Sequence, residues 1–340
     1  MKISIYEIDL EKAVKEIKDK NYKLIGIQVP EGLKIHLFKI IEILKKETDA
    51  EYVICGDPCY GACDLVDKKY KGLGVELLIH IGHTKIPSLK NTEIPVLFLN
   101  AIADLDIKEV LEKAIPSING KNIGILTTAQ HSHIIDDVIK ILKKNNFNPV
   151  VSDGDKRIDF PGQILGCNFS SASRVKDKVD MYLFIGSGNF HPLGMILSTD
   201  KDVIVCDPYS KKVSFRELSE YKDMLLKQRY GAISNSKMAK KFGIIISHKE
   251  GQKRIDEAFK LKDMIEKKGR QAFVIAVDYL NPQSLETFRE IDCFVSTACP
   301  RIAIDDYLCY KTPIITPVEL EIVLGYRKWD EYKFDEILDK

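Results

Sequence analysis

The stretch YKLIGIQVP, residues 22–30, is a short aliphatic run that contains a glycine and ends at a proline. The pattern returns as KNIGILTTA at residues 121–129 and as KFGIIIS at residues 241–247. Runs of this length and composition are typical of strands, and a pattern that recurs at wide spacing indicates repeated structural units. The sequence therefore predicts three related units, each opened by one of these strands.

The glycines of these strands, Gly26, Gly124 and Gly243, set the repeat at 98 residues (124 − 26) and then 119 residues (243 − 124). Both values lie within the usual size of a domain. In each unit three further aliphatic runs follow, separated by Lys/Glu-rich helical stretches. Nearly continuous Val/Ile/Leu runs indicate parallel strands buried on both faces, with the helices as crossovers. We predict an α/β protein of three repeated small parallel-sheet domains, at residues 1–105, 106–215 and 216–340.

Composition excludes several classes of function. The 340 residues are 45% hydrophobic and 30% charged, and 51 Lys and Arg balance 50 Asp and Glu, so nucleic acid and anionic membranes are not expected partners. Residues 1–20 are charged and amphipathic, without the apolar stretch of a secretory signal, and no apolar run approaches membrane-spanning length. We expect a cytoplasmic protein. Eight cysteines in such a chain favour metal binding or free thiols over disulfides.

Three of the cysteines lie in the segment CGDPCYGAC, residues 55–63, close to the C-x3-C-x2-C spacing of conventional radical S-adenosylmethionine enzymes. In one continuous helix their thiols would share a face, but Gly56, Asp57 and Pro58 break such a helix. A local iron–sulfur or zinc site is therefore not favoured. Cys55 is better interpreted as the end of a strand, and Cys59 as a loop residue near a site without being a ligand.

Cys63, Cys167 and Cys299 each follow a predicted strand, and each belongs to a different predicted domain. Ligands of parallel α/β units gather at the carboxyl ends of the strands, so these three cysteines are the strongest candidates for a shared site. Free cysteine is often fully buried as a small hydrophobic residue. Four cysteines receive that interpretation: Cys55, Cys206, Cys293 and Cys309.

Polar residues at other strand ends are candidates for binding a cofactor. The loop GSGNFHPLG, residues 186–194, offers backbone donors, small residues and a histidine, although a glycine-containing turn is also the ordinary way to end a strand. No G-x-x-x-x-G-K-[ST] phosphate loop and no G-x-S-x-G elbow is present, so ATPase and serine hydrolase functions lack their central residues. The candidate cofactor residues are Gln28, Glu31, Gly186, Gly188, His191 and Arg301.

The histidines give a weaker signal. His80 and His83 have the i, i+3 spacing of a metal pair, but they follow a strand, where alternation points the two side chains to opposite faces. We therefore do not expect them to meet. Two further pairs are interpreted as turn or helix-start residues: His131 with His133, and Asp305 with Asp306.

Six segments together resemble the archaeal 2-(3-amino-3-carboxypropyl)histidine synthase family, which starts diphthamide synthesis. They are IQVPEGL, YGACD, IGHTKIP, GQILGCN, GNFHPLG and ACPRIAIDD, and they occur in order over nearly the whole chain. The resemblance implies that Cys63, Cys167 and Cys299 hold a [4Fe–4S] cluster with the three domains arranged around it. Three thiolates on four irons leave one iron without a protein ligand, where a substrate can approach.

The resemblance also implies an activity, a transfer from S-adenosylmethionine as co-substrate. In this family the reduced cluster cleaves the bond between sulfur and the γ-carbon, which yields methylthioadenosine and a 3-amino-3-carboxypropyl radical that adds to a histidine of translation elongation factor 2. A homodimer and an electron donor for the cluster are further implied. Two alternatives stay open: a quinolinate synthase-like iron–sulfur dehydratase, and a non-catalytic or electron-transfer cluster subunit.

Overall fold

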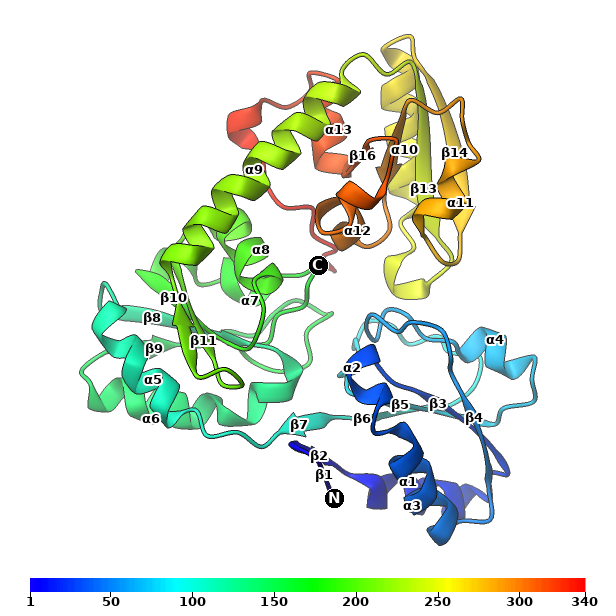
Figure 1. Ribbon diagram of the computed structural model, residues 1–340, viewed down its shortest axis with the longest axis vertical. Helices are drawn as coiled ribbons and strands as arrows, with labels where there is room; N and C mark the ends of the chain where they lie inside the picture. Colours follow the sequence, from blue (N-terminus) through cyan, green and yellow to red (C-terminus); the bar gives the residue numbers. More distant parts are fainter. Residues whose placement is uncertain (340) are drawn as a thin grey trace.

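The computed structural model describes residues 1–339, and its chain folds into three α/β units grouped around a common centre (Figure 1). The first unit carries a four-stranded parallel sheet in the order β4-β3-β5-β6. Its elements are α1 (Leu10–Lys20), β3 (Leu24–Gln28), α2 (Glu31–Lys34), α3 (Leu37–Glu47), β4 (Glu51–Ile54), α4 (Asp67–Lys71), β5 (Leu77–Ile81) and β6 (Val96–Leu99).

The middle unit has a five-stranded sheet in the order β12-β11-β10-β8-β9. Its helices are α5 (Lys108–Ala114), α6 (Ile135–Lys144), α7 (Ser170–Ser173) and α8 (Phe190–Thr199), with 3₁₀ turns η1 (Ile115–Ser117), η2 (Ala129–Ile134) and η3 (Lys176–Lys178). Its strands are β8 (Asn122–Thr127), β9 (Asn148–Val150), β10 (Met181–Ile185), β11 (Val203–Asp207) and β12 (Lys212–Ser214).

The long helix α9 (Arg216–Ser236) leads into the C-terminal unit, whose parallel sheet has the order β14-β13-β15-β16 (Figure 1). Its strands are β13 (Lys241–Ser247), β14 (Gln271–Val277), β15 (Cys293–Ser296) and β16 (Ile314–Ile315). Its helices are α10 (Ile255–Lys267), α11 (Pro282–Glu286), α12 (Pro300–Ile304) and α13 (Pro317–Val323), with 3₁₀ turns η4 (Glu250–Gln252), η5 (Tyr307–Cys309) and η6 (Trp329–Glu331).

In each unit the first strand lies between the second and the third, and the fourth lies beyond the third, so the predicted repeat of parallel α/β sheets is confirmed. Two antiparallel additions were not predicted. β12 closes one edge of the middle sheet, and β1 (Lys2–Ile3) with β2 (Tyr6–Ile8) pairs with β7 (Ala101–Ala103) in a small separate sheet. The predicted divisions at residues 105 and 215 fall between β7 and α5 and between β12 and α9.

The repeated glycine has a steric reason. A Cβ atom on Gly124 would lie 2.4 Å from the ring of Tyr182, its partner on β10, and one on Gly243 would lie 2.7 Å from Phe294, its partner on β15. At Gly26 the obstructing ring is that of Tyr70, at 2.9 Å. Such distances are shorter than carbon atoms tolerate, so each first strand needs glycine where a large side chain crosses it.

Two burial predictions need correction. Burial on both faces was predicted for the parallel strands, but Phe273 on β14 is 49% exposed, because β14 is the edge strand of its sheet. Cys309 is exposed in η5 rather than buried, because that turn is on the surface. The prediction of burial is confirmed for the other three cysteines, Cys55, Cys206 and Cys293.

The C-terminal segment returns from the C-terminal unit to the middle unit (Figure 1). The backbone amide of Ile337 donates to the carbonyl of Cys167 at 2.7 Å, and the amide of Phe169 donates to the Glu336 carboxylate at 2.8 Å. Phe334 packs edge-on against Phe169, with 5.4 Å between ring centroids. This segment therefore ties the C-terminal unit to the loop that carries Cys167.

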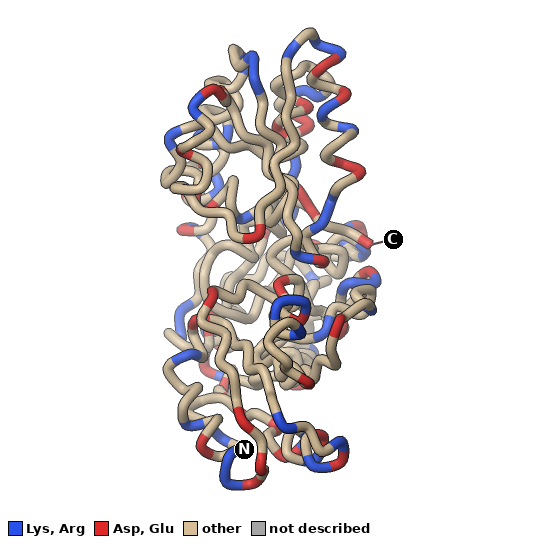
Figure 2. The backbone as a smooth tube through the Cα atoms, turned by 90° about the vertical axis from the view of Figure 1, so that its right-hand side faces the viewer, with Lys and Arg blue, Asp and Glu red and all other residues tan. Residues whose placement is uncertain are grey.

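The surface carries both charge signs, interspersed along the chain (Figure 2). Within residues 1–339, no helix combines the length and the apolar character that crossing a bilayer requires.

Candidate metal centre

A cavity of about 400 Å³ lies where the carboxyl ends of the three parallel sheets meet. Its walls come from the loops after β4, β5, β8, β9, β13, β14 and β15. Cys63, Cys167 and Cys299 all line it, so the structure brings together the three cysteines that the sequence assigned to different domains. Each of the three sheets thus contributes one cysteine to the cavity from beyond the carboxyl ends of its strands, where parallel sheets usually bind ligands.

The three sulfurs influence one another but are too far apart to share a single ion. Burial, followed by the neighbouring Cys63, raises the pKa of the Cys167 thiol to about 12, and burial with both other thiols raises the pKa of Cys299. Within residues 1–339, the one group that places three such ligand atoms within 4.8 Å of one another contains none of these three cysteines, so at least two of their sulfurs lie farther apart than that. Sulfurs about 2.3 Å from one ion lie at most about 4.6 Å apart, so a multi-iron cluster suits this spacing better than a single ion.

Cys63 sits in close contact with the C-terminal unit. Gly251 approaches so closely that a Cβ atom there would lie 2.5 Å from the Cα atom of Cys63. The Gln252 side chain donates from Nε2 to the Cys63 sulfur at 3.3 Å. Burial raises the pKa of the Cys63 thiol, while the Gln252 hydrogen bond opposes that rise. A hydrogen bond to sulfur stabilises the thiolate, the form that binds iron.

Arg157 is a buried cation in the wall of this cavity that no sequence motif indicated. It donates from Nη2 to the carbonyl of Gly251 at 3.0 Å, whereas its Nε has no partner. Its charge lowers the pKa of Cys63 and of Cys167, against the stronger effect of burial. Arg157 therefore offsets part of the negative charge that thiolates bring into a low-dielectric site.

Arg254 connects the loop before Cys299 to the C-terminal segment. Its Nε donates to the carbonyl of Thr297 at 2.6 Å, and its guanidinium pairs with both oxygens of Asp335, at 3.0 and 2.7 Å. This pairing is bidentate, the most directional arrangement available to arginine. Because Asp335 is on the C-terminal segment that also contacts Cys167, one segment supports two of the three cysteine loops.

Two of the six predicted cofactor residues line the cavity, His191 in the first turn of α8 and Arg301 in α12. The Arg301 guanidinium lies 4.3 Å from the ring centroid of Phe190 and pairs with Asp305 at 2.8 Å. Burial, with a smaller effect of Arg301, lowers the pKa of His191 to about 4, so its imidazole is neutral. Asp305 follows the last turn of α12, so the helix-start interpretation is wrong for it, whereas Asp306 directly precedes the 3₁₀ turn η5 and fits that interpretation.

The other four predicted cofactor residues are not among the described residues that line the cavity. Gln28 is fully buried, and its amide is held by the Asp64 carbonyl and by His80. Glu31 is exposed and pairs with Lys34 at 2.6 Å. Gly186 and Gly188 have φ values of 155° and 77°, which suit a glycine turn between β10 and α8. His131 and His133 lie in η2, as the interpretation of helix-start residues predicts.

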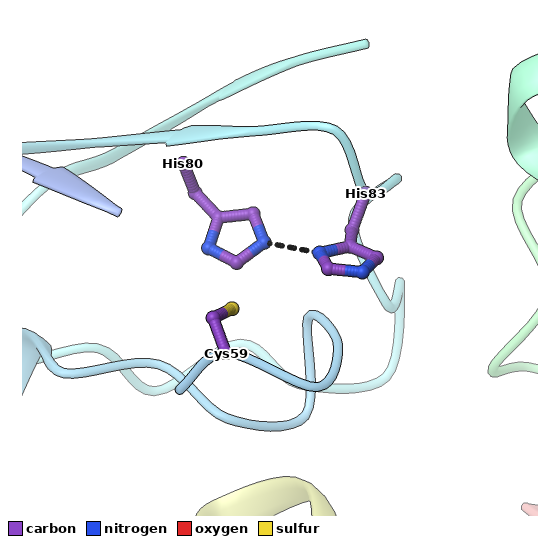
Figure 3. Close-up of side chains that lie close together, drawn as sticks. All are labelled: Cys59, His80 and His83. Carbon is purple, nitrogen blue, oxygen red and sulfur yellow. Dashed lines mark hydrogen bonds between the residues drawn. The ribbon is translucent and has the colours of Figure 1, made fainter. Parts of the chain in front are cut away.

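The expectation that His80 and His83 point apart is wrong. His80 Nε2 and His83 Nδ1 are 3.0 Å apart, and the ring centroids are 5.2 Å apart (Figure 3). Strand β5 ends at Ile81, and Gly82 has a φ of 99°, which turns the chain back on itself. Strand alternation therefore stops between the two histidines, and the glycine in His-Ile-Gly-His is the signal that indicates the turn.

Comparison with known proteins identifies the family. The family model described as "Putative diphthamide synthesis protein" matches residues 29–333. The chain belongs to this family. It is 39% identical to a 2-(3-amino-3-carboxypropyl)histidine synthase from Pyrococcus horikoshii, over 98% of this chain and 94% of that relative. It is 36% identical, with the same two coverages, to the synthase of that name from Methanocaldococcus jannaschii.

The family fold is also known from crystal structures. That of Dph2 from Pyrococcus horikoshii with a 4Fe–4S cluster matches with a TM-score of 0.88 and 38% identity, over 98% of this chain and 94% of that one. A second structure of that Dph2 gives a TM-score of 0.89 at 37% identity, with the same coverages. The three-unit architecture is thus the architecture of this family.

Proposed function

We propose that this protein catalyses the first step of diphthamide biosynthesis, the transfer of a 3-amino-3-carboxypropyl group from S-adenosylmethionine to a histidine of translation elongation factor 2. The convergence of Cys63, Cys167 and Cys299 on one cavity carries the proposal. It occurs in a chain that is 39% identical, over nearly its whole length, to a synthase of that name. The protein is on this basis a transferase.

The residues around the cavity fit a [4Fe–4S] cluster held by three thiolates. The donor set is sulfur only, and the three sulfurs are spaced too widely for one ion. When bound and reduced, such a cluster would supply the electron for cleavage of the carbon–sulfur bond of S-adenosylmethionine, and three thiolates would leave one of its irons without a protein ligand. Gln252 and Arg157 stabilise the thiolates on the side of Cys63 and Cys167.

His191 and Arg301 are the residues we assign to the co-substrate. Both line the cavity beside Cys167 and Cys299, and Arg301 can pair with the carboxylate of the methionyl group through its guanidinium. The neutral imidazole of His191 offers one donor and one acceptor. Together they would hold the amino acid end of the co-substrate so that its γ-carbon, rather than its ribose, faces the cluster.

Access for the protein substrate runs past two tyrosines at the rim. Tyr60 and Tyr279 line the cavity, are 58% and 44% exposed, and bring their hydroxyl oxygens to 3.5 Å from each other. A histidine on a loop of the elongation factor would enter between the N-terminal and C-terminal units. We further propose a homodimer, a separate electron donor for the cluster, and action in the cytoplasm, where translation factors work.

The test is an anaerobic assay of the reconstituted protein with dithionite and S-adenosylmethionine, with and without elongation factor 2, read by mass spectrometry. The expected products are methylthioadenosine and a single 3-amino-3-carboxypropyl adduct on one histidine of the factor. Cys167→Ala should lose cluster iron and product together. Cys206→Ala, a buried cysteine of the same unit, is the matched control and should keep both.

Intact S-adenosylmethionine in the presence of a full, reducible cluster would contradict the proposal. Quinolinate formation would then be measured, because an open iron can also act as a Lewis acid in a dehydration. If neither reaction occurred, electron transfer from the reduced cluster to an added acceptor would be the function left to measure.

A further inference from the structure

A second group of potential metal ligands lies in the first unit, behind the wall of the cavity. Cys59, His80 and His83 place one ligand atom each within 4.8 Å of one another, and Figure 3 shows the Cys59 sulfur below the His80 ring, whose edge meets the His83 ring. Cys59 and His80 are buried, and His83 is half-buried and lines the cavity. None of the three belongs to the cysteine set described above.

The protein itself determines which nitrogen of His80 is available. Gln28 donates from Nε2 to the carbonyl of Asp64 at 2.6 Å, so its Oε1 is the atom that faces His80 Nδ1 at 3.0 Å. An amide oxygen only accepts, so Nδ1 of His80 carries the proton. Its Nε2 therefore presents a lone pair toward His83 and Cys59. This is the outer hydrogen bond that orients metal-binding histidines in proteins.

The spacing of the two nitrogen donors is close to that of two ligands of a tetrahedral ion. Zinc binds imidazole nitrogen at about 2.0–2.1 Å and thiolate at about 2.3 Å, which puts two nitrogen ligands about 3.3 Å apart. His80 Nε2 and His83 Nδ1 are 3.0 Å apart. The two nitrogens need to move apart by only a few tenths of an ångström to bind one ion. The second ring nitrogen of His83 points away from the group (Figure 3), so a proton can reside there.

We propose that Cys59, His80 and His83 form a zinc site with three protein ligands and one position open to water. One thiolate with two imidazoles is a donor set that zinc prefers, and three protein ligands plus water is its usual open arrangement. When zinc binds, the Cys59 thiol releases one proton to solvent, and the His83 proton moves from Nδ1 to Nε2 through water. No electron is transferred.

The site would act on the loop that carries Cys63. Cys59 is four residues before Cys63, whereas His80 and His83 flank the end of β5. A bound ion would fasten this loop to the sheet of the first unit. It would hold the Cys63 side of the cavity in place before the cluster is inserted. This inference stands on the geometry of the first unit and does not depend on the reaction proposed above.

The experiment uses cluster-loaded protein, prepared anaerobically, exposed to equimolar zinc sulfate and desalted. Zinc and iron are then counted per chain by mass spectrometry, and the zinc K-edge spectrum identifies the ligands. We expect one zinc per chain, with one sulfur at about 2.3 Å and two or three nitrogen or oxygen neighbours at about 2.0–2.1 Å. In chelator competition, Cys59→Ser and His83→Gln should each weaken zinc binding at least tenfold.

Cys55→Ala is the matched control, because Cys55 is buried in the same loop region but is not in the ligand group. It should bind zinc as the wild type does. A far-ultraviolet circular dichroism spectrum equal to that of the wild type shows that a variant has folded, and Cys59→Ser provides the test if His83→Gln does not fold. The proposal is overturned if wild-type protein with full iron retains no more zinc than Cys59→Ser. Two or more sulfur ligands would also overturn it, since zinc would then occupy the cluster cysteines.

Discussion

The C-terminal unit is joined to its two neighbours by different chemistry. Its contact with the middle unit includes the C-terminal segment. There the Ile337 amide donates to the Cys167 carbonyl, the Phe169 amide donates to the Glu336 carboxylate, and the ring of Phe334 packs between aromatic side chains. Its contact with the N-terminal unit includes side-chain ion pairs, the close approach of Gly251 to Cys63, and the side-chain contacts Gln252–Cys63 and Tyr60–Tyr279. The ion pairs are Lys68–Glu250, Lys69–Asp278 and Lys249–Asp64.

The cavity therefore has two different sides. The side formed with the middle unit, called the firm side below, is held by hydrogen bonds to main-chain groups and aromatic packing, and the side formed with the N-terminal unit depends on electrostatic interactions. Main-chain hydrogen bonds and aromatic packing are insensitive to salt, whereas exposed ion pairs are screened over about 10 Å at 0.1 M salt. Lys69 and Asp278 are 54% and 49% exposed, but Lys249 and Asp64 are only 14% and 6% exposed. Cys167 and Cys299 therefore belong to the firm side, and Cys63 to the other.

The largest effect is expected from Asp335→Ala, which breaks the firm side. It leaves the nearly buried Arg254 without its bidentate partner, and removing one member of a buried pair costs about 3–5 kcal/mol. Urea unfolding measures the loss. The control is Glu257→Ala, which removes the other, more exposed carboxylate of the same arginine and should cost less than about 1 kcal/mol. Equal losses in the two variants would show that burial of the pair does not matter.

A smaller effect is expected from Gly251→Ala on the other side of the cavity. The new methyl group would meet the backbone of Cys63, and overpacking of this kind costs about 1–3 kcal/mol. We expect less iron per chain after reconstitution, because the loop of Cys63 must move. Gly56→Ala is the matched control, since a Cβ atom there meets no heavy atom within 4 Å. Full iron loading of Gly251→Ala would mean that the N-terminal unit shifts freely.

The junction between the N-terminal and middle units allows a pH test. Burial, then His133, lowers the pKa of His131 to about 4, with Asp207 opposing, and its Nδ1 has no partner. Because the folded pKa lies below the usual 6.5, the unfolded chain takes up the proton first. Stability is complete above pH 6.5 and falls as the pH drops toward 4, by up to about 1.4 kcal/mol per pH unit.

His131→Phe should remove this contribution while keeping a ring against Tyr209. Urea unfolding at pH 6.5 and pH 5 should show that wild type loses more stability than the variant, by at most about 2 kcal/mol. An identical loss in both proteins would mean that His131 is protonated equally in the folded and unfolded chains.

The smallest effect is expected from the exposed ion pairs. Lys68→Ala and Lys69→Ala should each cost less than about 1 kcal/mol at low salt, and the cost should vanish at 1 M salt. The measurement is urea unfolding at the two salt concentrations. Salt-independent losses would show that the aliphatic stems of these lysines, rather than their charges, hold the units together.

Sequence alone determined the repeat and the three principal cysteines. Three features are local patterns: the aliphatic runs of strand length, the recurring glycine, and the position of Cys63, Cys167 and Cys299 after strands. Local patterns can be recognised without knowledge of the tertiary structure. The rule that parallel strands present their carboxyl ends to a common edge then predicted that these cysteines face ligands. The same reasoning missed the edge exposure of β14 and the surface position of Cys309, because exposure depends on which neighbours cover an element.

Only the tertiary structure decided which residues surround those cysteines. Arg157 and Gln252 line the cavity and Arg254 supports the loop before Cys299; all three lie in segments with no periodic pattern, and their partners are 94, 189 and 81 residues away in sequence. His80 and His83 meet because one glycine with positive φ ends the strand between them. Side-chain contacts of this kind are set by how separate units pack, so periodicity and spacing, which describe neighbours along the chain, contain no information about them.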